Sequence, residues 1–345
     1  MAKKKVKVGI IGCGAIAERL HIPDYIDCGR AKIVAFCDVD KKRAQANADQ
    51  HSPGAAVYTD YKALLKNADV EAVSVCMPNK FHGVVSIAAA KAGKHVLVEK
   101  PMAMSLAEAK RMVAAAEKAE VLLMVNQSQR KYPAHIKAKE VLDSDIMGKV
   151  LHVTAMFGHE GPEFWSPSGK WFFNKKEARF GVMADLGVHK ADLIRFLTGK
   201  EIVEINAFYK TVEKKRTDVD DNFVSSFVFD DGSVGTLAAS WTAKGGMANY
   251  TILHCENGTL EVCLHADKPL VANMMKPGCQ INFDMPAPPS NYDGSWGLDI
   301  GGSFVRAIMG EEKPFCTGVE GMKSLAVILA AEKAADTRKT VKVTV

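Results

Sequence analysis

The sequence predicts an α/β fold with two domains, the first built on a parallel sheet and the second on an open, mostly antiparallel sheet. At 345 residues the chain is longer than one ordinary hydrophobic core supports. Short apolar runs alternate with helical patterns up to residue 126, which is typical of parallel strands joined by crossover helices. After that point, apolar and polar residues alternate over several segments, as in a half-buried antiparallel sheet. We therefore place the domains at residues 1–126 and 127–345.

The first predicted strand leads directly into a glycine-rich turn. It covers residues 6–11, and the sequence Gly-Cys-Gly-Ala-Ile-Ala at residues 12–17 separates it from a helical pattern. A G-x-G-x-x-A pattern between a strand and a helix is the context that a dinucleotide-binding turn requires. Gly12 permits the tight turn, Gly14 lets a pyrophosphate approach the backbone, and Ala17 permits close packing of the helix on the strand. The helix N-terminus then favours the phosphate charge.

The second predicted strand, residues 32–37, ends in Asp38, about 20 residues after the glycines. At that distance an acidic side chain accepts hydrogen bonds from the adenosine ribose of a dinucleotide. The alternative is that Asp38 caps the following helix. A carboxylate here repels a 2′-phosphate, so the sequence favours NAD, with NADP as the alternative because of the cations Lys41, Lys42 and Arg43. We expect these three cations to point to solvent.

A further strand, residues 70–75, is followed by Pro78, Asn79 and His82. In open parallel sheets, ligands bind beyond the carboxyl ends of the strands. Asn79 and His82 are therefore candidates for contact with the cofactor. The alternative is that Asn79 caps the next helix and that His82 lies at the surface.

The central stretch of the chain is His-Val-Leu-Val-Glu-Lys-Pro at residues 95–101. Residues 95–98 are expected to form a buried strand, which Pro101 ends because proline has no N–H to donate. Glu99 and Lys100 then lie at the ligand-binding edge, where a lysine can hold a substrate hydroxyl and move its proton. The alternative is that both side chains only solvate the end of the strand.

One more helix and strand complete the predicted parallel sheet. The helix covers residues 105–118, with Ser105 as its N-cap and Glu108 at the capping-box position. The strand covers residues 121–125.

The second half contains an aromatic-rich loop and then an acid–histidine pair. The loop, residues 160–180, includes Trp171; loops of this length are commonly functional, so its aromatic residues either line a pocket or cover the core. Asp185 and His189 are four residues apart and share a face if both are helical. A carboxylate beside a histidine can act as an acid–base unit near neutral pH. The alternative is an N-capping Asp185 and a packed His189.

Several alternating segments between residues 201 and 283, the last named of them at 259–264, predict an antiparallel sheet, with turn signals at Asp231-Gly232 and Asn257-Gly258. We expect one face of this sheet to lack helices and Trp241 to lie on it. Large exposed apolar patches are usually contact surfaces, so this face indicates a homodimer or homotetramer. The remaining predicted elements are a Pro-rich loop at 285–293 and helices at 298–309 and 319–337.

Composition limits the classes of partner. The chain is 48% hydrophobic and 25% charged, which is typical of globular proteins. Its net charge of +5 is spread along the chain and does not indicate a nucleic-acid groove. No apolar stretch approaches the roughly 18 residues of a membrane span. The eight cysteines include no Cys-x-x-Cys pair, so we expect no metal site, no disulfide framework and a reducing, cytoplasmic compartment.

Five short motifs follow one another along the chain. They are Gly12-x-Gly14-x-x-Ala17, Pro78-Asn79-x-x-His82, Glu99-Lys100-Pro101, Asn126-Gln127-x-x-Arg130 and Asp185-x-Gly187-x-His189-x-x-Asp192. Together they resemble the Gfo/Idh/MocA oxidoreductase family, which contains inositol and other sugar dehydrogenases. The resemblance covers nearly the whole chain. It implies a Rossmann domain that binds NAD or NADP, followed by a domain with an open antiparallel sheet, with a small polyol or sugar substrate between the domains.

The resemblance also implies the residues of the site. Lys100 and His189 would handle the substrate hydroxyl, and Asp185 would help to position it. The implied cofactor-binding residues are Gly12, Gly14, Ala15, Ile16, Asp38, Pro78, Asn79, His82, Glu99, Lys100 and Gln127. The implied substrate-binding residues are Lys100, Arg130, Trp171, Asp185 and His189. Two positions depart from the family pattern, Phe180 where many members have glycine and Phe172 where members often carry arginine.

The expected reaction is hydride transfer between a secondary alcohol and the nicotinamide ring. His189 accepts the hydroxyl proton, and Lys100 donates to the same oxygen and stabilises the developing alkoxide. Two other classes stay open, namely a glycosidase that uses tightly bound NAD without net redox change and a non-catalytic nucleotide-binding regulator. NADH that accumulates in proportion to product would exclude the glycosidase, and the acid–base residues argue against the regulator.

Overall fold

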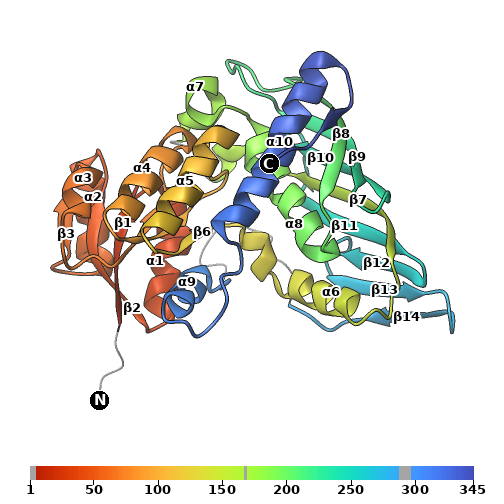
Figure 1. The fold of residues 1–345 in the computed structure, drawn as a ribbon, viewed down its shortest axis with the longest axis horizontal. Coiled ribbons are helices and arrows are strands. Elements are labelled where there is room, and N and C mark those ends of the chain that lie inside the picture. The colour runs from red at the N-terminus through yellow and green to blue at the C-terminus, as the bar shows by residue number, and fades with distance from the viewer. Residues whose placement is uncertain (1–4, 167–168, 287–296) are drawn as a thin grey trace. The chain divides into compact units, whose positions relative to one another are not determined.

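The computed structural model describes residues 5–166, 169–286 and 297–345, and its chain divides into two compact units (Figure 1). The first unit takes its described residues from Met1–Ser128 and Asn291–Met322, and the second takes them from Gln129–Ser290 and Lys323–Val345. The sequence analysis assigns residues 291–322 to the second domain, whereas the described residues among them, 297–322, belong to the first unit. Thr317, for example, forms a β-bridge to Met124 of the first unit.

The first unit contains a six-stranded parallel sheet in the order β3-β2-β1-β4-β5-β6. Its strands are β1 (Val6–Ile11), β2 (Ala31–Cys37), β3 (Ala56–Tyr58), β4 (Ala72–Val75), β5 (His95–Val98) and β6 (Leu123–Val125). The strand order reverses between β1 and β4, and in such sheets ligands bind at the carboxyl edge beside this point. The predicted Rossmann topology is therefore confirmed, and β3 is the strand that the sequence analysis missed.

Helices follow the strands of the first unit. They are a π-helical turn η1 (Ala17–His21), α1 (Ile22–Asp27), α2 (Lys41–His51), α3 (Tyr61–Leu65), α4 (Asn79–Lys91), α5 (Leu106–Lys118) and α9 (Ile300–Ile308). Helix α4 packs beside α5, and α1 packs beside α9 (Figure 1). The predicted cap of α5 is confirmed, since the Ser105 hydroxyl accepts a hydrogen bond from the Glu108 N–H at 3.2 Å. The Glu108 carboxylate accepts from the N–H of Met104 rather than from that of the cap residue.

The second unit contains a nine-stranded sheet in the order β14-β13-β12-β11-β7-β10-β9-β8-β15. Its strands are β7 (Val150–Gly158), β8 (Ile202–Lys210), β9 (Asn222–Phe229), β10 (Val234–Ser240), β11 (Ala248–Cys255), β12 (Gly258–Val262), β13 (Leu270–Met274), β14 (Cys279–Asn282) and β15 (Val341–Lys342). Strands β7 and β10 are parallel, and the other neighbours are antiparallel. The prediction of an open, mostly antiparallel sheet is confirmed; β13, β14 and β15 were not predicted.

The helical elements of the second unit include several short turns between β7 and β8. The elements are α6 (Pro133–Asp143), η3 (Pro162–Phe164), η4 (Lys170–Phe173), α7 (Lys175–Ala178), the π-helical turn η5 (Met183–Gly187), α8 (Val188–Thr198) and α10 (Gly318–Thr337), which begins in the first unit; a short turn η2 (Ser128–Lys131) precedes α6. The aromatic-rich segment at 160–180 is thus mostly helical turns and not an extended loop. The predicted Pro-rich loop at 285–293 lies mostly outside the described residues.

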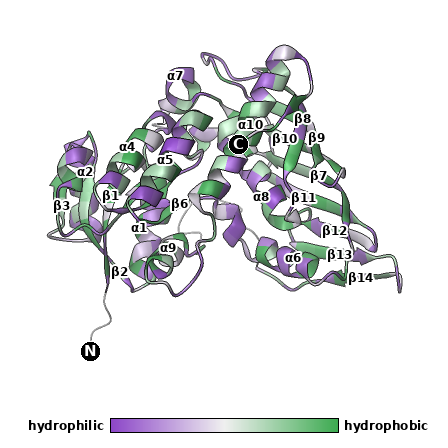
Figure 2. Cartoon of the chain, in the orientation of Figure 1, coloured by the Kyte–Doolittle hydropathy of each residue, from purple (hydrophilic) through white to green (hydrophobic). Residues whose placement is uncertain are grey.

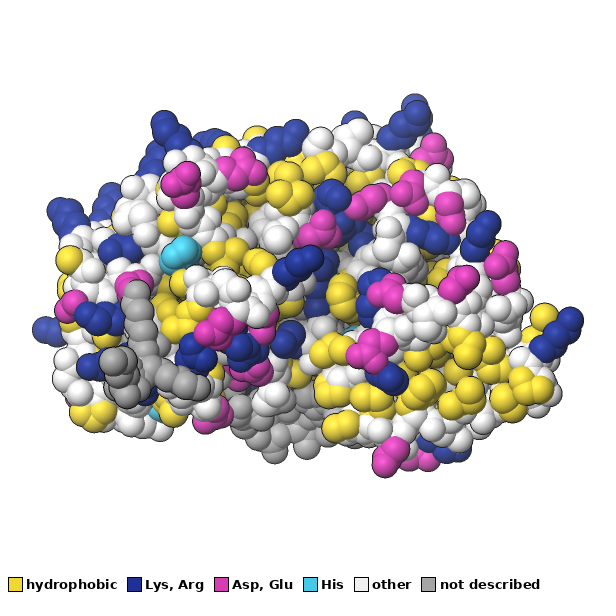
Figure 3. Space-filling model, turned by 60° about the horizontal axis from the view of Figure 1, so that its bottom comes forward, with side chains coloured by type: hydrophobic (Ala, Val, Ile, Leu, Met, Phe, Trp, Pro, Cys, Tyr) yellow, Lys and Arg dark blue, Asp and Glu magenta, His cyan; other side chains and the backbone are white. Residues whose placement is uncertain are grey.

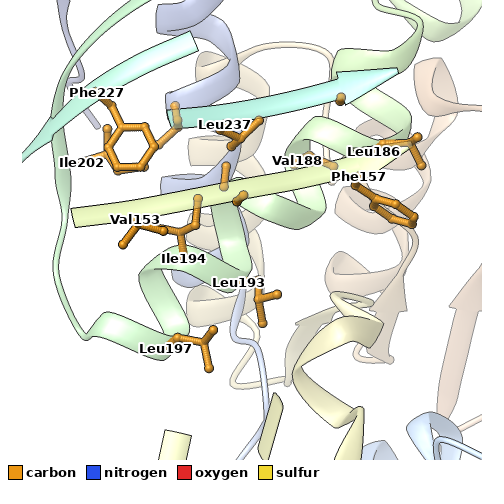
Figure 4. Close-up of a cluster of buried hydrophobic side chains, with 14 of the residues drawn as sticks. Val153, Phe157, Leu186, Val188, Leu193, Ile194, Leu197, Ile202, Phe227 and Leu237 are labelled. Atoms are coloured by element: carbon orange, nitrogen blue, oxygen red, sulfur yellow. The ribbon is translucent and has the colours of Figure 1, made fainter. Parts of the chain in front are cut away.

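The core of the second unit lies between one face of its sheet and the helices. Hydrophobic and hydrophilic residues are interspersed along these strands (Figure 2), and inward-facing residues such as Val153 and Phe157 of β7 are buried. They belong to one apolar cluster with Val188 and Ile194 of α8 (Figure 4). Trp241 is also fully buried in this cluster, so the expectation that it lies on an exposed sheet face is wrong. An indole this large is more stable in the core, where its N–H finds a partner.

The opposite face of this sheet carries partly exposed apolar side chains. Phe208 is 62% exposed, Val224 is 52% exposed and Val234 is 47% exposed. These three residues lie on the adjacent strands β8, β9 and β10, at positions that alternate with buried residues. This surface is called the outer sheet face below.

Candidate active site

The glycine-rich turn after β1 has the geometry of a phosphate-binding turn. Gly12 has a φ of +92°, and a Cβ there would lie 2.4 Å from the carbonyl oxygen of Cys76, so no other residue fits. A Cβ on Gly14 would meet nothing within 4 Å, which leaves open space beside the backbone. Ala15 and Ile16 form the first residues of the following helix, whose N-terminus favours negative charge. The turn therefore fits the pyrophosphate of a dinucleotide.

Asp38 lies at the end of β2, beside this turn. Its carboxylate accepts hydrogen bonds from the N–H of Cys13 and from the N–H of Asp40, both at 2.9 Å. The N-cap of α2 is Asp40, so the alternative role of Asp38 as a helix cap is wrong. Arg43 does not simply point to solvent as expected, because its guanidinium lies 3.2 and 3.3 Å from the two oxygens of Asp38. A cation therefore stands next to the predicted ribose-binding carboxylate.

His82 holds together two loops at the carboxyl edge of the sheet. Its ring is buried, and its two nitrogens lie 2.6 Å from the carbonyl oxygen of Met77 and 2.7 Å from that of Pro101. Burial lowers the pKa of His82. Both ring nitrogens face backbone carbonyls, so His82 supports these loops and is neither a surface residue nor a donor aimed at a ligand. The buried Asn79 begins α4, whose N-cap is Pro78 without a side-chain bond, so capping by Asn79 is also wrong.

Glu99 is buried and does not solvate the end of β5. Its Oε1 accepts hydrogen bonds from Nε2 of His21 at 2.8 Å and from Nδ2 of Asn126 at 2.6 Å, while its Oε2 accepts from the backbone N–H of Lys100 at 3.2 Å. Burial alone raises the pKa of Glu99, but the hydrogen bond and charge of His21, with help from Lys100 and Asn126, lower it to about 2. The predicted position of Lys100 at the end of β5 is confirmed. Its backbone N–H is fixed by the hydrogen bond to the side chain of Glu99.

Two amide oxygens at the end of β6 point to a missing partner. The side-chain oxygens of Asn126 and Gln127 are buried and accept no hydrogen bond from any described residue. Buried polar atoms normally have a partner, so an unsatisfied oxygen here is a suitable acceptor for a ligand N–H. The carboxamide of a nicotinamide ring carries such donors. The residues present therefore fit NAD at the glycine turn and at this edge.

The second unit holds the acid–histidine pair. Asp185 lies in the π-helical turn η5, so it is not an N-cap, and His189 lies in the first turn of α8. Oδ2 of Asp185 accepts a hydrogen bond from the indole N–H of Trp241 at 2.9 Å, and Nε2 of His159 lies 3.6 Å from the same oxygen. The ring of Phe157 contacts the rings of both His159 and His189. Residues 157, 159, 185, 189 and 241 thus form one cluster, called the acid–histidine cluster below.

The turn that carries Asp185 is built around Asp220. The carboxylate of Asp220 accepts from the N–H of Gly181 at 2.7 Å and from that of Met183 at 2.8 Å. A Cβ on Gly181 would lie 1.9 Å from the carbonyl oxygen of Asp220, so the close approach requires glycine. Burial raises the pKa of Asp220 to about 6, against the lowering effect of these hydrogen bonds.

Arg130 and Trp171, which were predicted to bind substrate, make contacts inside the second unit. Nε and Nη2 of Arg130 donate to Asp192 at 2.7 and 2.8 Å, and both side chains are buried. Trp171 stacks on Phe172 with 3.8 Å between ring centroids. Phe172 and Phe180, the two departures from the family pattern, are buried members of the core. Those two substitutions therefore contribute to packing.

Several functional residues were missed from the sequence. His21, His159, Trp241 and Asp220 make their contacts with residues 26 to 78 positions away, and no spacing rule connects them. The signal for His159 was its place directly after β7, and for Trp241 its place directly after β10, because polar groups at strand ends often serve a site. Lys100 belongs to the first unit, and Asp185 and His189 belong to the second.

Other kinds of site find no support within the described part of the chain. It contains no group of three or more His, Cys, Asp or Glu residues arranged to hold a metal ion, and none of its helices is long and apolar enough to cross a bilayer. Figure 3 shows side chains of both charge signs interspersed over one face of the molecule. On this face the charged side chains do not form the basic stripe of a nucleic-acid groove.

Comparison with known proteins identifies the family. Residues 6–127 match the model described as an oxidoreductase family with an NAD-binding Rossmann fold, and residues 135–261 match the model of the GFO/IDH/MocA C-terminal domain. The chain belongs to the Gfo/Idh/MocA oxidoreductase family. It is thus an NAD-binding oxidoreductase, and the family, the fold and the cofactor expected from the five motifs are confirmed.

Relatives cover almost the whole chain. The 1,5-anhydro-D-fructose reductase of Ensifer adhaerens is 28% identical, with 97% of this chain and 98% of the relative aligned. The myo-inositol 2-dehydrogenase of Thermotoga maritima is 26% identical, with 98% of each chain aligned. A structure of levoglucosan dehydrogenase in complex with NADH superposes with a TM-score of 0.86 at 22% identity, over 99% of this chain and 100% of the other. The last similarity supports the fold.

Proposed function

We propose that this Gfo/Idh/MocA protein is an NAD-dependent dehydrogenase that acts on a secondary alcohol of a cyclitol or sugar derivative. The observation that carries the proposal is the acid–histidine cluster. In it, the indole N–H of Trp241 orients the Asp185 carboxylate, and His159 lies beside the same carboxylate. The ring of Phe157 contacts both His159 and His189. Its counterpart is Lys100 at the carboxyl edge of the Rossmann sheet. A regulator that only binds a nucleotide has no need of these groups.

Each residue of the site has a stated part in the proposed reaction. The ammonium of Lys100 donates to the substrate oxygen and stabilises its developing negative charge. His189 accepts the hydroxyl proton as general base, and Asp185 positions the substrate and stabilises the charge that His189 acquires. NAD supplies the acceptor for the hydride. The proposed cofactor-binding residues are those predicted from the sequence, namely Gly12, Gly14, Ala15, Ile16, Asp38, Pro78, Asn79, Glu99, Lys100 and Gln127. His82 was also predicted, but it is left out because both of its ring nitrogens face backbone carbonyls.

The substrate class is inferred from chemistry and from relatives. Relatives along the full length of the chain are named as enzymes of anhydrofructose and of myo-inositol, which are polyhydroxylated rings. We therefore propose a small polyol or sugar ring as substrate for this chain too.

A substrate screen tests the proposal. Purified protein would be incubated with NAD and a panel of inositols, monosaccharides, anhydrosugars and nucleotide sugars, and NADH would be followed by its absorbance. We expect at least one ring to give NADH in proportion to a ketone product. Product formation without accumulation of NADH would instead support the redox-neutral glycosidase. No turnover of any member of the panel would contradict the proposal.

We further propose that the outer sheet face forms the contact of a homodimer or homotetramer. Support comes from the half-exposed Phe208, Val224 and Val234 on neighbouring strands, since apolar patches of this kind commonly mark contact surfaces. Light scattering at micromolar concentration should give the mass of a dimer or tetramer, and the variant Val224→Glu should shift the measured mass toward that of the monomer. A monomer mass for the unmodified chain would contradict the assembly.

We also propose a cytoplasmic protein, because the eight cysteines are all free thiols.

A further inference from the structure

A buried histidine in the first unit has no part in the mechanism above. His21 ends the π-helical turn η1 and is fully buried. Its Nε2 lies 2.8 Å from Oε1 of Glu99, and its Nδ1 lies 3.1 Å from the hydroxyl of Ser74. That hydroxyl is in turn 2.7 Å from the phenol of Tyr25. Single π-helical turns are frequent at functional sites.

The contacts of His21 are compatible with an imidazolium. Oε1 of Glu99 accepts from Nε2, and the Ser74 hydroxyl beside Nδ1 is able either to accept from the ring or to donate to it. Burial alone lowers the pKa of His21, but its neighbours Cys76 and Glu99 raise it well above the usual value. The 2.8 Å contact between Nε2 of His21 and Oε1 of Glu99, together with this direction of shift, supports a buried ion pair.

Stability alone is a weak explanation for such a pair. Buried ion pairs are often replaceable by apolar residues without loss of stability, because the desolvation cost offsets the attraction. Removing one partner, however, leaves an uncompensated charge that the protein must expel or neutralise. Glu99 without His21 would be such a charge, and it could keep its present position only by taking up a proton.

The position of Glu99 matters because Lys100 depends on it. Oε2 of Glu99 accepts from the backbone N–H of Lys100, while Oε1 is shared by His21 and Asn126. One carboxylate thus joins the helix after the glycine turn, the end of β5 and the end of β6. The residue whose backbone it fixes is the one proposed to hold the substrate oxygen.

We propose that His21 is a positioning residue for Lys100, acting through Glu99. The charged imidazole keeps Glu99 ionised and in place, and Glu99 keeps the Lys100 backbone in the one conformation that presents the ammonium at the carboxyl edge of the sheet. This inference rests on the proposed dehydrogenase function for its catalytic readout, and on the first unit alone for its structural readout.

The catalytic test compares His21→Gln with His95→Gln. Glutamine at position 21 keeps a hydrogen-bond donor but removes the charge. His95 is a matched control, because it starts the same strand β5 and its Nδ1 accepts from the N–H of Leu122 at 3.0 Å. We expect His21→Gln to lower kcat about 10- to 100-fold with the Kd of NAD changed less than about twofold, and His95→Gln to leave kcat within about twofold.

A second comparison separates positioning from a general structural role. In the Lys100→Ala background, His21→Gln should change the residual turnover by less than about twofold, since the group it positions is gone. A similar loss in both backgrounds would contradict the proposal, as would a normal kcat for His21→Gln. If His21→Gln does not fold, Glu99→Gln carries the same comparison.

An activity-independent readout keeps this inference distinct from the proposed function. Hydrogen exchange of the Lys100 amide should be slow in the unmodified protein and at least about tenfold faster in His21→Gln, while the amide of Val98 stays unchanged. Nitrogen NMR should show both ring nitrogens of His21 protonated at neutral pH. Unchanged exchange at Lys100, or a neutral His21, would overturn the inference even if the enzyme is a sugar dehydrogenase. A failed substrate screen with these two results as expected would overturn only the proposed function.

Discussion

The two units each hold a buried carboxylate at their candidate site, and they hold it in different ways. Glu99 is paired with the buried imidazole of His21 and has both oxygens engaged inside its own unit. Asp185 is oriented through one oxygen by the indole N–H of Trp241, with His159 at 3.6 Å. His159 accepts the Gly161 N–H at Nδ1, so its neutral ring carries the proton on the nitrogen that faces Asp185.

The two carboxylates have different roles. Glu99 holds the backbone and is called the fixed charge below, whereas Asp185 takes part in the proposed proton transfer and is called the working carboxylate below. A carboxylate compensated by a cation has little influence on a neighbouring proton transfer, so Glu99 serves to hold the backbone. The indole N–H that orients Asp185 is a neutral donor and does not cancel the negative charge, so we expect Asp185 to stabilise a histidine that takes up a proton. Each carboxylate is connected with a π-helical turn, because Asp185 lies within η5 and His21, the partner of Glu99, is the last residue of η1.

The largest expected effect lies on the residue next to the fixed charge. Lys100→Ala should lower kcat by about 10²- to 10⁴-fold, because it removes the group that donates to the substrate oxygen. The Kd of NAD, measured by quenching of intrinsic fluorescence, should stay nearly unchanged. Lys91→Ala, an exposed lysine at the end of α4, is the control and should have normal turnover. Turnover close to that of the unmodified enzyme would remove Lys100 from the mechanism.

The charge of Glu99 should be visible in the pH dependence of stability. Its pKa is lowered to about 2, so between its ordinary value near 4.5 and about 2 the unfolded chain binds more protons than the folded one. The free energy of unfolding should therefore fall by about 3 kcal/mol as the pH drops through this window, and Glu99→Gln should lack that dependence. Urea titrations at several pH values measure it.

Asp220 provides a control of opposite sign. Its pKa is raised to about 6, so its contribution to stability is greatest below its ordinary value near 3.8 and is lost as the pH rises through about 6. Asp220→Asn should remove this second pH dependence of the free energy of unfolding.

The Glu99 prediction has its own contrary outcome. If the free energy of unfolding changes equally with pH in the unmodified protein and in Glu99→Gln between pH 4.5 and 2, Glu99 is not the buried anion described above.

The working carboxylate is tested by removing its indole donor. Trp241→Phe keeps the ring in the core but deletes the hydrogen bond to Asp185. A hydrogen bond to a charged group is worth about 1.5–3 kcal/mol, so kcat should fall about 10- to 100-fold if this bond orients Asp185 for the reaction. Circular dichroism would verify the fold of the variant. A change of less than twofold would mean that Asp185 is oriented by other contacts.

The smallest effect concerns the cofactor. Asp38 should repel the 2′-phosphate of NADP and accept from the hydroxyl of NAD, so the preference for NAD should exceed about tenfold. Asp38→Ala should reduce the difference between the Kd values of NADP and NAD, because Arg43 then remains as the contact for the phosphate. The double variant Asp38→Ala with Arg43→Ala should lose the increase in NADP affinity that Asp38→Ala gives. Fluorescence titration with both cofactors decides it. A Kd for NADP equal to or lower than that for NAD would contradict this assignment.

Much of the candidate site could be predicted because its signals are local. The positive φ of Gly12, the hydrogen bond from Glu108 to the Ser105 cap and the placement of Lys100 directly after β5 follow from a few neighbouring residues. The alternation of polar and apolar residues likewise predicted the half-buried second sheet. Backbone sterics and side-chain periodicity act over short stretches, so a single sequence shows them.

Other features needed the folded chain. The sequence analysis missed the pairing of His21 with Glu99, which are 78 residues apart, and it placed Trp241 on the surface when the indole is fully buried on Asp185. It also missed the parallel pairing of β7 with β10. These outcomes depend on which strands become neighbours and on whether a buried polar group finds a partner. The sequence alone therefore determined the elements and the chemistry at their ends, whereas the tertiary structure decided which charges are compensated, since desolvation is set by surroundings that no local pattern encodes.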